Sequence, residues 1–175
     1  IYSAHSTPTE EEKITTLATY GHSGMYDYVA ELRPSTIYEN RSTMGPGEGK
    51  LYIKIVENLR IAFSYRFSCD RSTAIVTEYN VDMDIESPGK WVKRFTAVPE
   101  NSVSSNGNAV SFSTELFVSV PWFEGLRATI DDETGTSSSS YNLSIKPSIH
   151  TRAETDVGTV DENFTPELVM NFSYG

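Results

Sequence analysis

The alternation of apolar and polar residues predicts two long consecutive β-strands near the middle of the chain. Between Leu59 and Phe67 every second residue is apolar, and the same period of two runs from Thr73 to Ile85 after a short polar link. Successive side chains of a strand point to opposite faces, so each run has one apolar and one mostly polar face. Two such runs joined by a short link are typical of a long antiparallel hairpin. Its apolar face requires a second layer, which favours a β-sandwich.

Shorter runs with strand character lie on both sides of this central pair. We expect them to form strands separated by polar turns, with a long loop over residues 34–49. Pro121 and the helical spacing of the apolar residues after it predict one short helix over residues 121–131. The other predicted strands are residues 14–20, 25–33, 50–56, 91–98, 109–119, 141–149 and 166–174, and the predicted turns are residues 21–24, 87–89, 100–108 and 156–163.

These elements place the chain among the all-β proteins. They predict an antiparallel β-sandwich of nine or ten strands, Ig-like or jelly-roll-like, with at most one short helix. At 175 residues the chain has the length of one domain, which we expect over residues 14–175. The polar residues 1–13 include three successive glutamates and are expected to form a linker or a frayed N-terminal segment.

Charge and hydropathy narrow the range of partners. The net charge is −10, from 14 Lys and Arg against 24 Asp and Glu, which argues against nucleic acid as a partner. No apolar run approaches the roughly 18–20 residues that a membrane helix needs. Because the chain begins at Ile1 and not at Met, we expect it to be a piece of a longer protein, with any membrane anchor outside this piece.

Four copies of the Asn-X-Ser/Thr pattern indicate export. This acceptor pattern for N-glycosylation begins at Asn40, Asn142, Asn163 and Asn171. Asn142 and Asn171 alternate with apolar neighbours, so both are expected to face solvent. Ordinary surface asparagines give the same pattern, and that reading stays open for each of the four.

Acidic residues offer the oxygen ligands that calcium prefers, although none of them has the spacing of an EF-hand loop. Asp82 and Asp84 fall on the polar face of one predicted strand, and Asp131, Asp132 and Glu133 are consecutive in the sequence. These five are weak calcium candidates. The alternative is that they form solvated acidic faces and turn caps.

The sequence contains no catalytic motif. The histidines, His5, His22 and His150, are far apart and lack the spacing of a zinc-binding or nucleophile-activating set. The one cysteine, Cys69, leaves no disulfide and no cysteine-based zinc site within the chain. We therefore predict no catalytic residue, no metal and no cofactor.

Aromatic residues at the ends of predicted elements are candidates for ligand contact. Trp91, Trp122 and Tyr38 do not fall on the apolar faces that alternation assigns to the core. Flat aromatic faces suit sugar rings or a partner protein, since they give contact area at a low entropic cost. The alternative is that these rings complete the core.

Four segments in a fixed order resemble the archaeal family known as domain of unknown function 5305 (DUF5305). They are Tyr28-Val-Ala-Glu-Leu-Arg-Pro-Ser-Thr-Ile-Tyr-Glu-Asn, the strand Leu59–Phe67, Ser87-Pro-Gly-Lys-Trp-Val-Lys, and the Glu133-Thr-Gly turn before Tyr141-Asn-Leu-Ser-Ile-Lys-Pro. The resemblance covers residues 20–172. It implies an exported domain carried by a membrane-anchored archaeal protein. It implies no activity and no functional residues.

Three hypotheses follow. The first is a non-enzymatic extracytoplasmic domain of a cell-surface protein that serves in adhesion, envelope structure or protein interaction, with a cell-envelope protein or glycan as partner. The second is a carbohydrate-binding module, in one version supported by calcium, which needs Trp91 or Trp122 exposed. The third is an envelope enzyme, which needs His22 or His150 beside an acid and a nucleophile.

Overall fold

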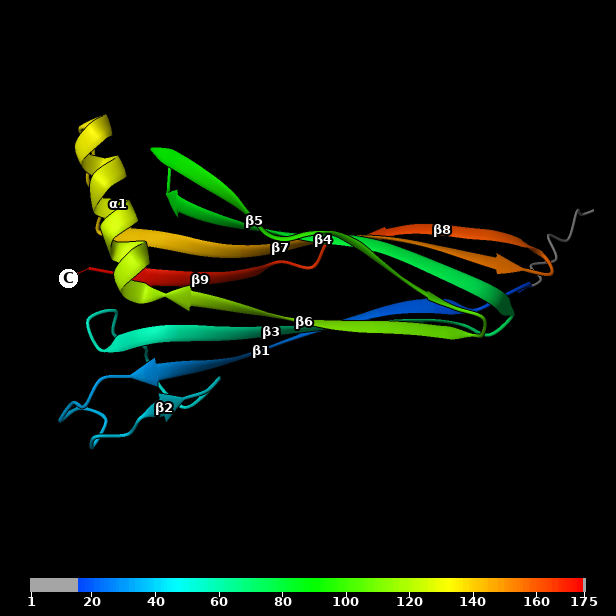
Figure 1. The fold of residues 1–175 in the computed structure, drawn as a ribbon, viewed down its shortest axis with the longest axis horizontal. Coiled ribbons are helices and arrows are strands. Elements are labelled where there is room, and N and C mark those ends of the chain that lie inside the picture. Colours follow the sequence, from blue (N-terminus) through cyan, green and yellow to red (C-terminus); the bar gives the residue numbers. More distant parts are fainter. Residues whose placement is uncertain (1–15, 175) are drawn as a thin grey trace, which may run out of the picture.

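The computed structural model describes residues 16–174, which form two antiparallel β-sheets packed face to face and one helix (Figure 1). The elements are β1 (Tyr20–Leu32), β2 (Thr43–Met44), β3 (Val56–Cys69), β4 (Ser72–Ser87), β5 (Trp91–Ser105), β6 (Ala109–Ser119), α1 (Val120–Thr134), β7 (Ser140–Thr155), β8 (Gly158–Phe164) and β9 (Leu168–Ser173). The first sheet has the order β2-β1-β3-β6, and the second has the order β5-β4-β7-β8, with β9 also paired to β7. The predicted all-β sandwich with one short helix is confirmed. The segment predicted to be a linker, residues 1–13, lies outside the described residues.

The two central strands do not form the predicted hairpin. β3 pairs with β1 and β6, whereas β4 pairs with β5 and β7. The short link at Asp70 and Arg71 therefore carries the chain from one sheet to the other (Figure 1). The apolar faces of β3 and β4 meet across the core. Alternation states only that each strand has one buried face, so it fits both arrangements. The prediction was right about burial and wrong about pairing.

β1 runs without interruption through the predicted turn at residues 21–24. A Cβ atom built on Gly24 would lie 2.9 Å from the Phe164 ring and 3.2 Å from the Phe63 ring. This glycine therefore marks a close approach of neighbouring side chains inside a strand. Residues 16–19, which belong to the predicted strand 14–20, are not in a strand.

Three other boundaries differ from the prediction. β5 continues past Pro99 to Ser105, which an edge strand tolerates because one side of its backbone needs no partner. Residues 158–163, predicted as part of an acidic turn over residues 156–163, belong to β8 at the margin of the second sheet. Residues 50–55, predicted as a strand, form an irregular segment with a turn, and β3 begins at Val56.

β8 and β9 share one margin of β7. β8 pairs with residues 149–155 of β7, and β9 pairs with residues 140–145. Pro147, which lacks a backbone N–H, lies between these two stretches, where neither strand pairs with β7. Along this margin the proline therefore interrupts no strand pairing, while on the other side Pro147 is paired with Val81 of β4.

Two clusters of buried side chains fill the space between the sheets. The cluster nearer α1 includes Leu59, Ile61, Leu143, Tyr141 and Phe123, and the other includes Phe63, Tyr65, Phe67, Ile75 and Ile149. Full burial of a large apolar side chain contributes about 1.5–3 kcal/mol, so these clusters provide the main stabilisation of the fold. The predicted apolar faces of both central strands are confirmed as core.

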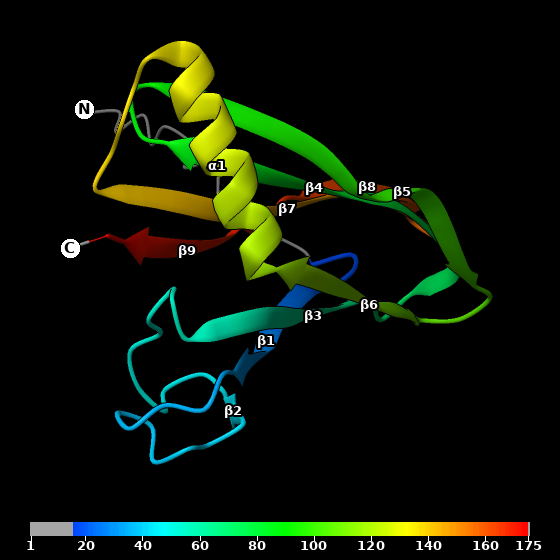
Figure 2. The same ribbon diagram turned by 60° about the vertical axis from the view of Figure 1, so that its left-hand side comes forward.

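Helix α1 lies across one end of the sandwich (Figure 2). The Ser119 side chain accepts a hydrogen bond from the Trp122 backbone N–H, Pro121 occupies the first turn, and Gly135 ends the helix at a φ of 65°. These are favourable residues for each position. The helix was predicted from Pro121 and the apolar spacing over residues 121–131, and it continues past that predicted end to Thr134. No helix within residues 16–174 is long and apolar enough to span a membrane.

Candidate functional site

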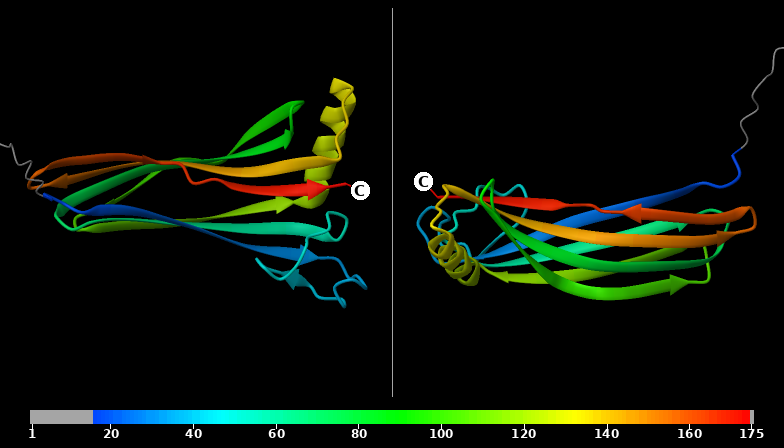
Figure 3. Two further views of the ribbon diagram at one scale, coloured as in Figure 1. Left: turned by 180° about the vertical axis from the view of Figure 1, so that it is seen from behind. Right: turned by 90° about the horizontal axis from the view of Figure 1, so that it is seen from above.

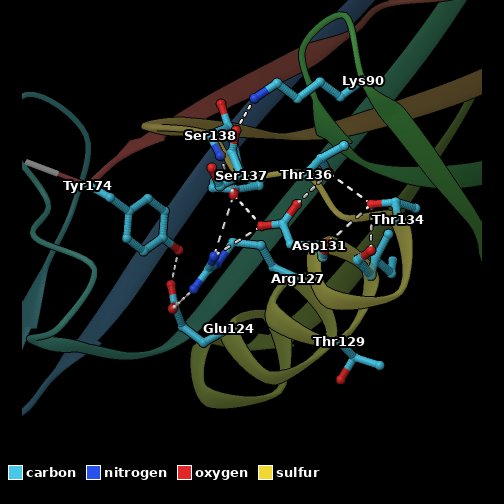
Figure 4. A network of polar contacts seen from close by, with 12 residues as sticks. Lys90, Glu124, Arg127, Thr129, Asp131, Thr134, Thr136, Ser137, Ser138 and Tyr174 are labelled. Atoms are coloured by element: carbon cyan, nitrogen blue, oxygen red, sulfur yellow. Dashed lines mark hydrogen bonds and ion pairs between the residues drawn. The ribbon is translucent and has the colours of Figure 1, made fainter.

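Asp131, in the last turn of α1, lies at the centre of a polar network that joins the helix to the second sheet (Figure 4). Its carboxylate accepts hydrogen bonds from Trp91 Nε1 at 2.9 Å, from Thr136 Oγ1 at 3.3 Å and from the Tyr141 hydroxyl. Arg127 Nη1 lies 3.3 Å from Asp131 Oδ2. Burial opposes ionisation, but the hydrogen bonds from Tyr141, Trp91 and Thr136 and the charge of Arg127 outweigh it and lower the pKa of Asp131.

Arg127 extends this network to the last described strand. Its guanidinium carbon lies 4.9 Å from the centre of the Tyr141 ring and 4.6 Å from that of Tyr174, which places the cation against two aromatic faces. Glu124 forms an ion pair with Arg127 and accepts a hydrogen bond from the Tyr174 hydroxyl. The network therefore holds α1 against β7 and the residue after β9. Arg127 Nε is the one nitrogen of that guanidinium that is buried without a hydrogen-bond partner among the described residues.

The five calcium candidates are not brought together. Asp131 is saturated by donors, while Asp132 and Glu133 are exposed beside it. Asp84 lies on the outer face of the second sheet, with Asp82 two residues before it on β4, whereas the other three candidates belong to α1. Within residues 16–174 no group of three or more His, Cys, Asp or Glu side chains is arranged to hold a metal ion.

Asp84 is neutralised by cations from both neighbouring strands. Arg94 of β5 donates to both of its oxygens, at 2.8 and 2.9 Å, and Lys146 Nζ of β7 donates to Oδ2 at 2.9 Å. The hydrogen bonds from Arg94 lower the pKa of Asp84 to about 2, with burial opposing them and Lys146 adding to them. A carboxylate paired in this way stabilises the sheet and has little capacity left for a calcium ion.

His150 lies in a row of charges further along the same outer face. Its Nε2 lies 2.7 Å from Asp161 Oδ1, and its Nδ1 lies 3.7 Å from Glu78 Oε2. The hydrogen bond to Asp161 is the main cause of a raised pKa for His150. The polar contacts of His150 in the described structure are with carboxylates, and they include no hydroxyl or thiol nucleophile.

His22 takes part in a chain of hydrogen bonds that crosses the core. Its Nδ1 lies 2.7 Å from the Tyr65 hydroxyl, which lies 2.9 Å from Thr151 Oγ1, and Thr151 lies 2.8 Å from Thr77 Oγ1. The imidazole stacks on the Phe164 ring at 5.1 Å, and its Nε2 is buried without a partner among the described residues. Burial lowers the pKa of His22. Cys69 is buried as well, at the end of β3.

Three of the glycosylation candidates share the outer face of the second sheet. Asn142 and Asn171 are opposite one another on β7 and β9, and Asn171 Nδ2 donates to Asn142 Oδ1 at 2.8 Å. Asn163 of β8 is opposite His150 and is exposed. Asn40 is exposed in the long loop, with a φ of 57°. The predicted placement of Asn142 and Asn171 opposite their apolar neighbours is confirmed.

The three candidate aromatics lie in separate environments. Trp91 is half-buried and donates to Asp131, and Tyr38 is only 8% exposed, with its hydroxyl donating to the Lys50 carbonyl. Trp122 is 43% exposed on α1 and meets the edge of the Phe95 ring at 5.4 Å. They do not form one exposed row, because the Tyr38 ring belongs to the core and the Trp91 ring to the Asp131 network.

A groove that the sequence did not indicate runs along the side of the sandwich beside β9. It consists of two hollows that share Tyr52 and Ser173, and it is lined by Tyr28, Ile37, residues 49–55 and residues 168–174. We call it the β9 groove. The groove was not predicted because residues 50–56 were expected to form a strand. In the structure residues 50–55 are irregular, and they form one wall of the groove.

No protein-family model matches the chain, and no curated protein matches it in sequence. Among solved structures, it is similar to AggA, the major subunit of aggregative adherence fimbriae type I from Escherichia coli, with 8% identity, a TM-score of 0.41, and coverage of 94% of this chain and 100% of that one. It is also similar to a protein from Archaeoglobus fulgidus, with 10% identity, a TM-score of 0.34, and coverage of 89% and 96%. At these TM-scores, neither likeness bears on function.

Proposed function

We propose that this chain is a non-enzymatic extracytoplasmic domain of a cell-surface protein, with a role in adhesion, envelope structure or protein interaction. The observation that carries the proposal is the gathering of Asn142, Asn163 and Asn171 on one solvent-facing side of the second sheet. A glycan is bulky and requires a surface site, which the exposed Asn163 and Asn171 offer, while Asn142 is half-buried. The resemblance to DUF5305, with its exported and membrane-anchored proteins, agrees with this role.

The surroundings of these asparagines support a surface that stays in water. The outer face of the second sheet carries cross-strand charge contacts, among them Asp84 with Arg94 and Lys146, and Asp161 with His150. Charged side chains on an outer face keep it solvated and discourage association through it. A glycan on this face therefore leaves the fold and the opposite sheet undisturbed.

The direction of the chain suits a domain placed in line with others. Residues 16–19 lie at the end of the sandwich where β3 passes into β4, and the chain leaves β9 beside α1 at the other end (Figure 3). Two contacts fix these ends, since the Asp70 N–H donates to the Thr19 carbonyl and the Tyr174 N–H donates to the Ser139 carbonyl. A domain entered and left at opposite ends extends a surface protein outward.

The test is the intact mass of the protein purified from the organism that makes it, compared with the encoded mass. We expect an excess of glycan size, which falls when Asn163→Gln or Asn171→Gln removes an acceptor. Asn101→Gln is the matched control, because Asn101 is exposed on β5 and outside the acceptor pattern. An unmodified mass would show that these asparagines carry no glycan and would contradict the proposal.

Carbohydrate binding is the second candidate, and the exposed ring of Trp122 beside Phe95 is the observation that favours it. Titration with an array of envelope oligosaccharides would show binding that Trp122→Ala abolishes. Phe117→Ala is the control, because Phe117 is exposed on β6, outside this pair. Equal binding by both variants would argue against this candidate.

A further inference from the structure

The β9 groove combines an apolar lining with space for a guest. Its two hollows have volumes of about 490 and 380 Å³. Ile37 is 58% exposed and Tyr52 is 41% exposed at its rim, while Leu168 and Met170 of β9 are half-buried along its floor. Exposed apolar side chains around a hollow are typical of a surface that receives a partner.

One margin of β9 has no partner strand among the described residues. β9 pairs with β7 alone, so the backbone groups along its other side are free to pair with an added strand. β9 also lacks the features that usually block such pairing, since its residues 168–173 include no proline and no charge. β5, the opposite margin of the same sheet, contains Pro99 and the charged Lys93, Arg94 and Glu100.

The charges around the groove favour an acidic guest. Arg33, Lys50 and Lys54 have no carboxylate within 4 Å in the described structure, although the chain as a whole is acidic. Lys50 and Lys54 line the groove, and Arg33 lines a hollow next to it with Lys54. Glu124 lies in that neighbouring hollow, but Arg127 and the Tyr174 hydroxyl engage it.

We propose that the β9 groove binds an extended segment of a partner protein, in which apolar and acidic residues alternate. The segment pairs with the free margin of β9, inserts its apolar side chains between β9 and residues 49–55, and directs its acidic side chains toward Lys50, Lys54 and Arg33. Backbone pairing supplies affinity in this mode, and the side-chain pockets and charges supply specificity. The proposal rests on the interaction role proposed above, but its test needs no glycan, so either can fail without the other.

The test uses a fluorescent peptide, Val-Glu-Val-Asp-Val-Glu, which matches the six residues of β9 in length. Its control, Val-Lys-Val-Lys-Val-Lys, keeps the apolar positions and reverses the charge. We expect fluorescence anisotropy to show saturable binding of the acidic peptide and binding of the basic peptide weaker by about tenfold or more. Equal affinities, or no binding of the acidic peptide at millimolar concentration, would overturn the proposal.

Variants separate the parts of the site. The double variant with Lys50→Glu and Lys54→Glu should bind the acidic peptide about tenfold more weakly. Lys93→Glu, at another lysine without an ion pair, should bind the acidic peptide with unchanged affinity. Ile37→Asn should weaken the binding of both peptides, because it removes an exposed part of the apolar rim without adding a charge. Loss of affinity in Lys93→Glu equal to that in the double variant would mean that net charge, and not the groove, binds the peptide.

Amide hydrogen exchange identifies where the peptide pairs. Bound acidic peptide should slow exchange in residues 168–173, and slowing confined to other strands would overturn strand addition at β9. Light scattering of the chain alone completes the test. Self-association that protects the same residues would make a second copy the occupant and would overturn the proposal of a separate partner.

Discussion

At the scale of single residues, the polar groups inside this sandwich join its two layers. The chain from His22 through Tyr65 and Thr151 to Thr77 connects β1 and β3 of the first sheet with β7 and β4 of the second. A buried hydroxyl without a partner is costly, so these contacts fix the relative position of the sheets more narrowly than apolar packing does. Alternation placed Tyr65 and Thr77 on core faces, but it could not pair them, because the pairing depends on how strands from different sheets meet.

The two described histidines should affect stability with opposite signs. Burial lowers the pKa of His22 in the folded state below its unfolded value of 6.5, so its contribution is present above pH 6.5 and is lost as the pH falls. The pKa of His150 is raised, so its contribution is complete below pH 6.5 and is lost as the pH rises through the folded value. On acidification from pH 7 to pH 5, the stabilising contribution of His22 therefore falls while that of His150 rises.

Urea unfolding at several pH values between 5 and 7 tests this in wild type, His22→Gln and His150→Gln. Relative to wild type, His22→Gln should lose less stability on acidification, and His150→Gln should lose more. The opposite order would show that the imidazole environments differ from those described, and parallel profiles would show that neither histidine titrates differently on folding.

At the scale of elements, close approach explains why β1 contains glycine. Gly24→Ala should destabilise the fold by about 1–3 kcal/mol, because its Cβ would meet the rings of Phe164 and Phe63. Gly21→Ala, in the same strand with nothing within 4 Å of the added Cβ, should change stability by less than about 0.5 kcal/mol. The free energies of unfolding from urea titrations measure both, and equal effects would contradict the close approach.

Helix α1 is held by its polar network as well as by the buried side chains of Val120 and Phe123. Asp131→Asn removes the ion pair with Arg127 and replaces one acceptor of the Trp91 and Tyr141 hydrogen bonds by a donor. We expect the free energy of unfolding to fall by about 2–4 kcal/mol. Faster amide exchange in residues 120–134 should accompany it. Asp132→Asn changes an exposed neighbour and is the matched control, with no effect expected on either measurement.

Elements differ in how far the sequence specifies them. β6 has the predicted bounds, and α1 begins where Pro121 predicted a helix, since this signal acts over a few neighbouring residues. Its end at Thr134, before Gly135, lies beyond the predicted end at residue 131. β8 was predicted as a turn because its acidic residues hide a pairing with β7 that only the folded chain provides. Structure that depends on neighbouring residues could be predicted from the sequence, whereas contacts between distant segments could not.

At the scale of the whole molecule, the arrangement of the two sheets and the β9 groove also depend on contacts between distant segments, whereas the acceptor asparagines depend on a local pattern. The sequence indicates that β3 and β4 each bury one face, but the crossing from one sheet to the other depends on which neighbours each strand pairs with. The sequon asparagines were found because their pattern is local. The β9 groove was missed because its walls, residues 49–55 and 168–174, are more than a hundred residues apart in sequence.

The placement of the chain ends predicts how the molecule responds to tension. Leu17 and Asp156 both contact Arg71 at one end, and Ser173 is paired with Ser140 at the other. β7 has 16 residues, so the two ends are separated by roughly 50 Å. Force applied between them runs along the strands, and the hydrogen bonds of an antiparallel pair lie perpendicular to the strands, so many bonds resist together.

Single-molecule pulling tests this with cysteine handles introduced by Thr16→Cys and Ser173→Cys. The control variant carries Thr16→Cys and Val157→Cys, two exposed positions at the same end, so that β1 and β8 are peeled away and their hydrogen bonds break one after another. Forced unfolding follows the unfolding rate, and the lengthwise geometry should need the higher force at equal pulling speed. Equal forces would contradict this anisotropy and the in-line placement proposed for the domain. A higher lengthwise force would match a surface domain that transmits tension from β1 to β9.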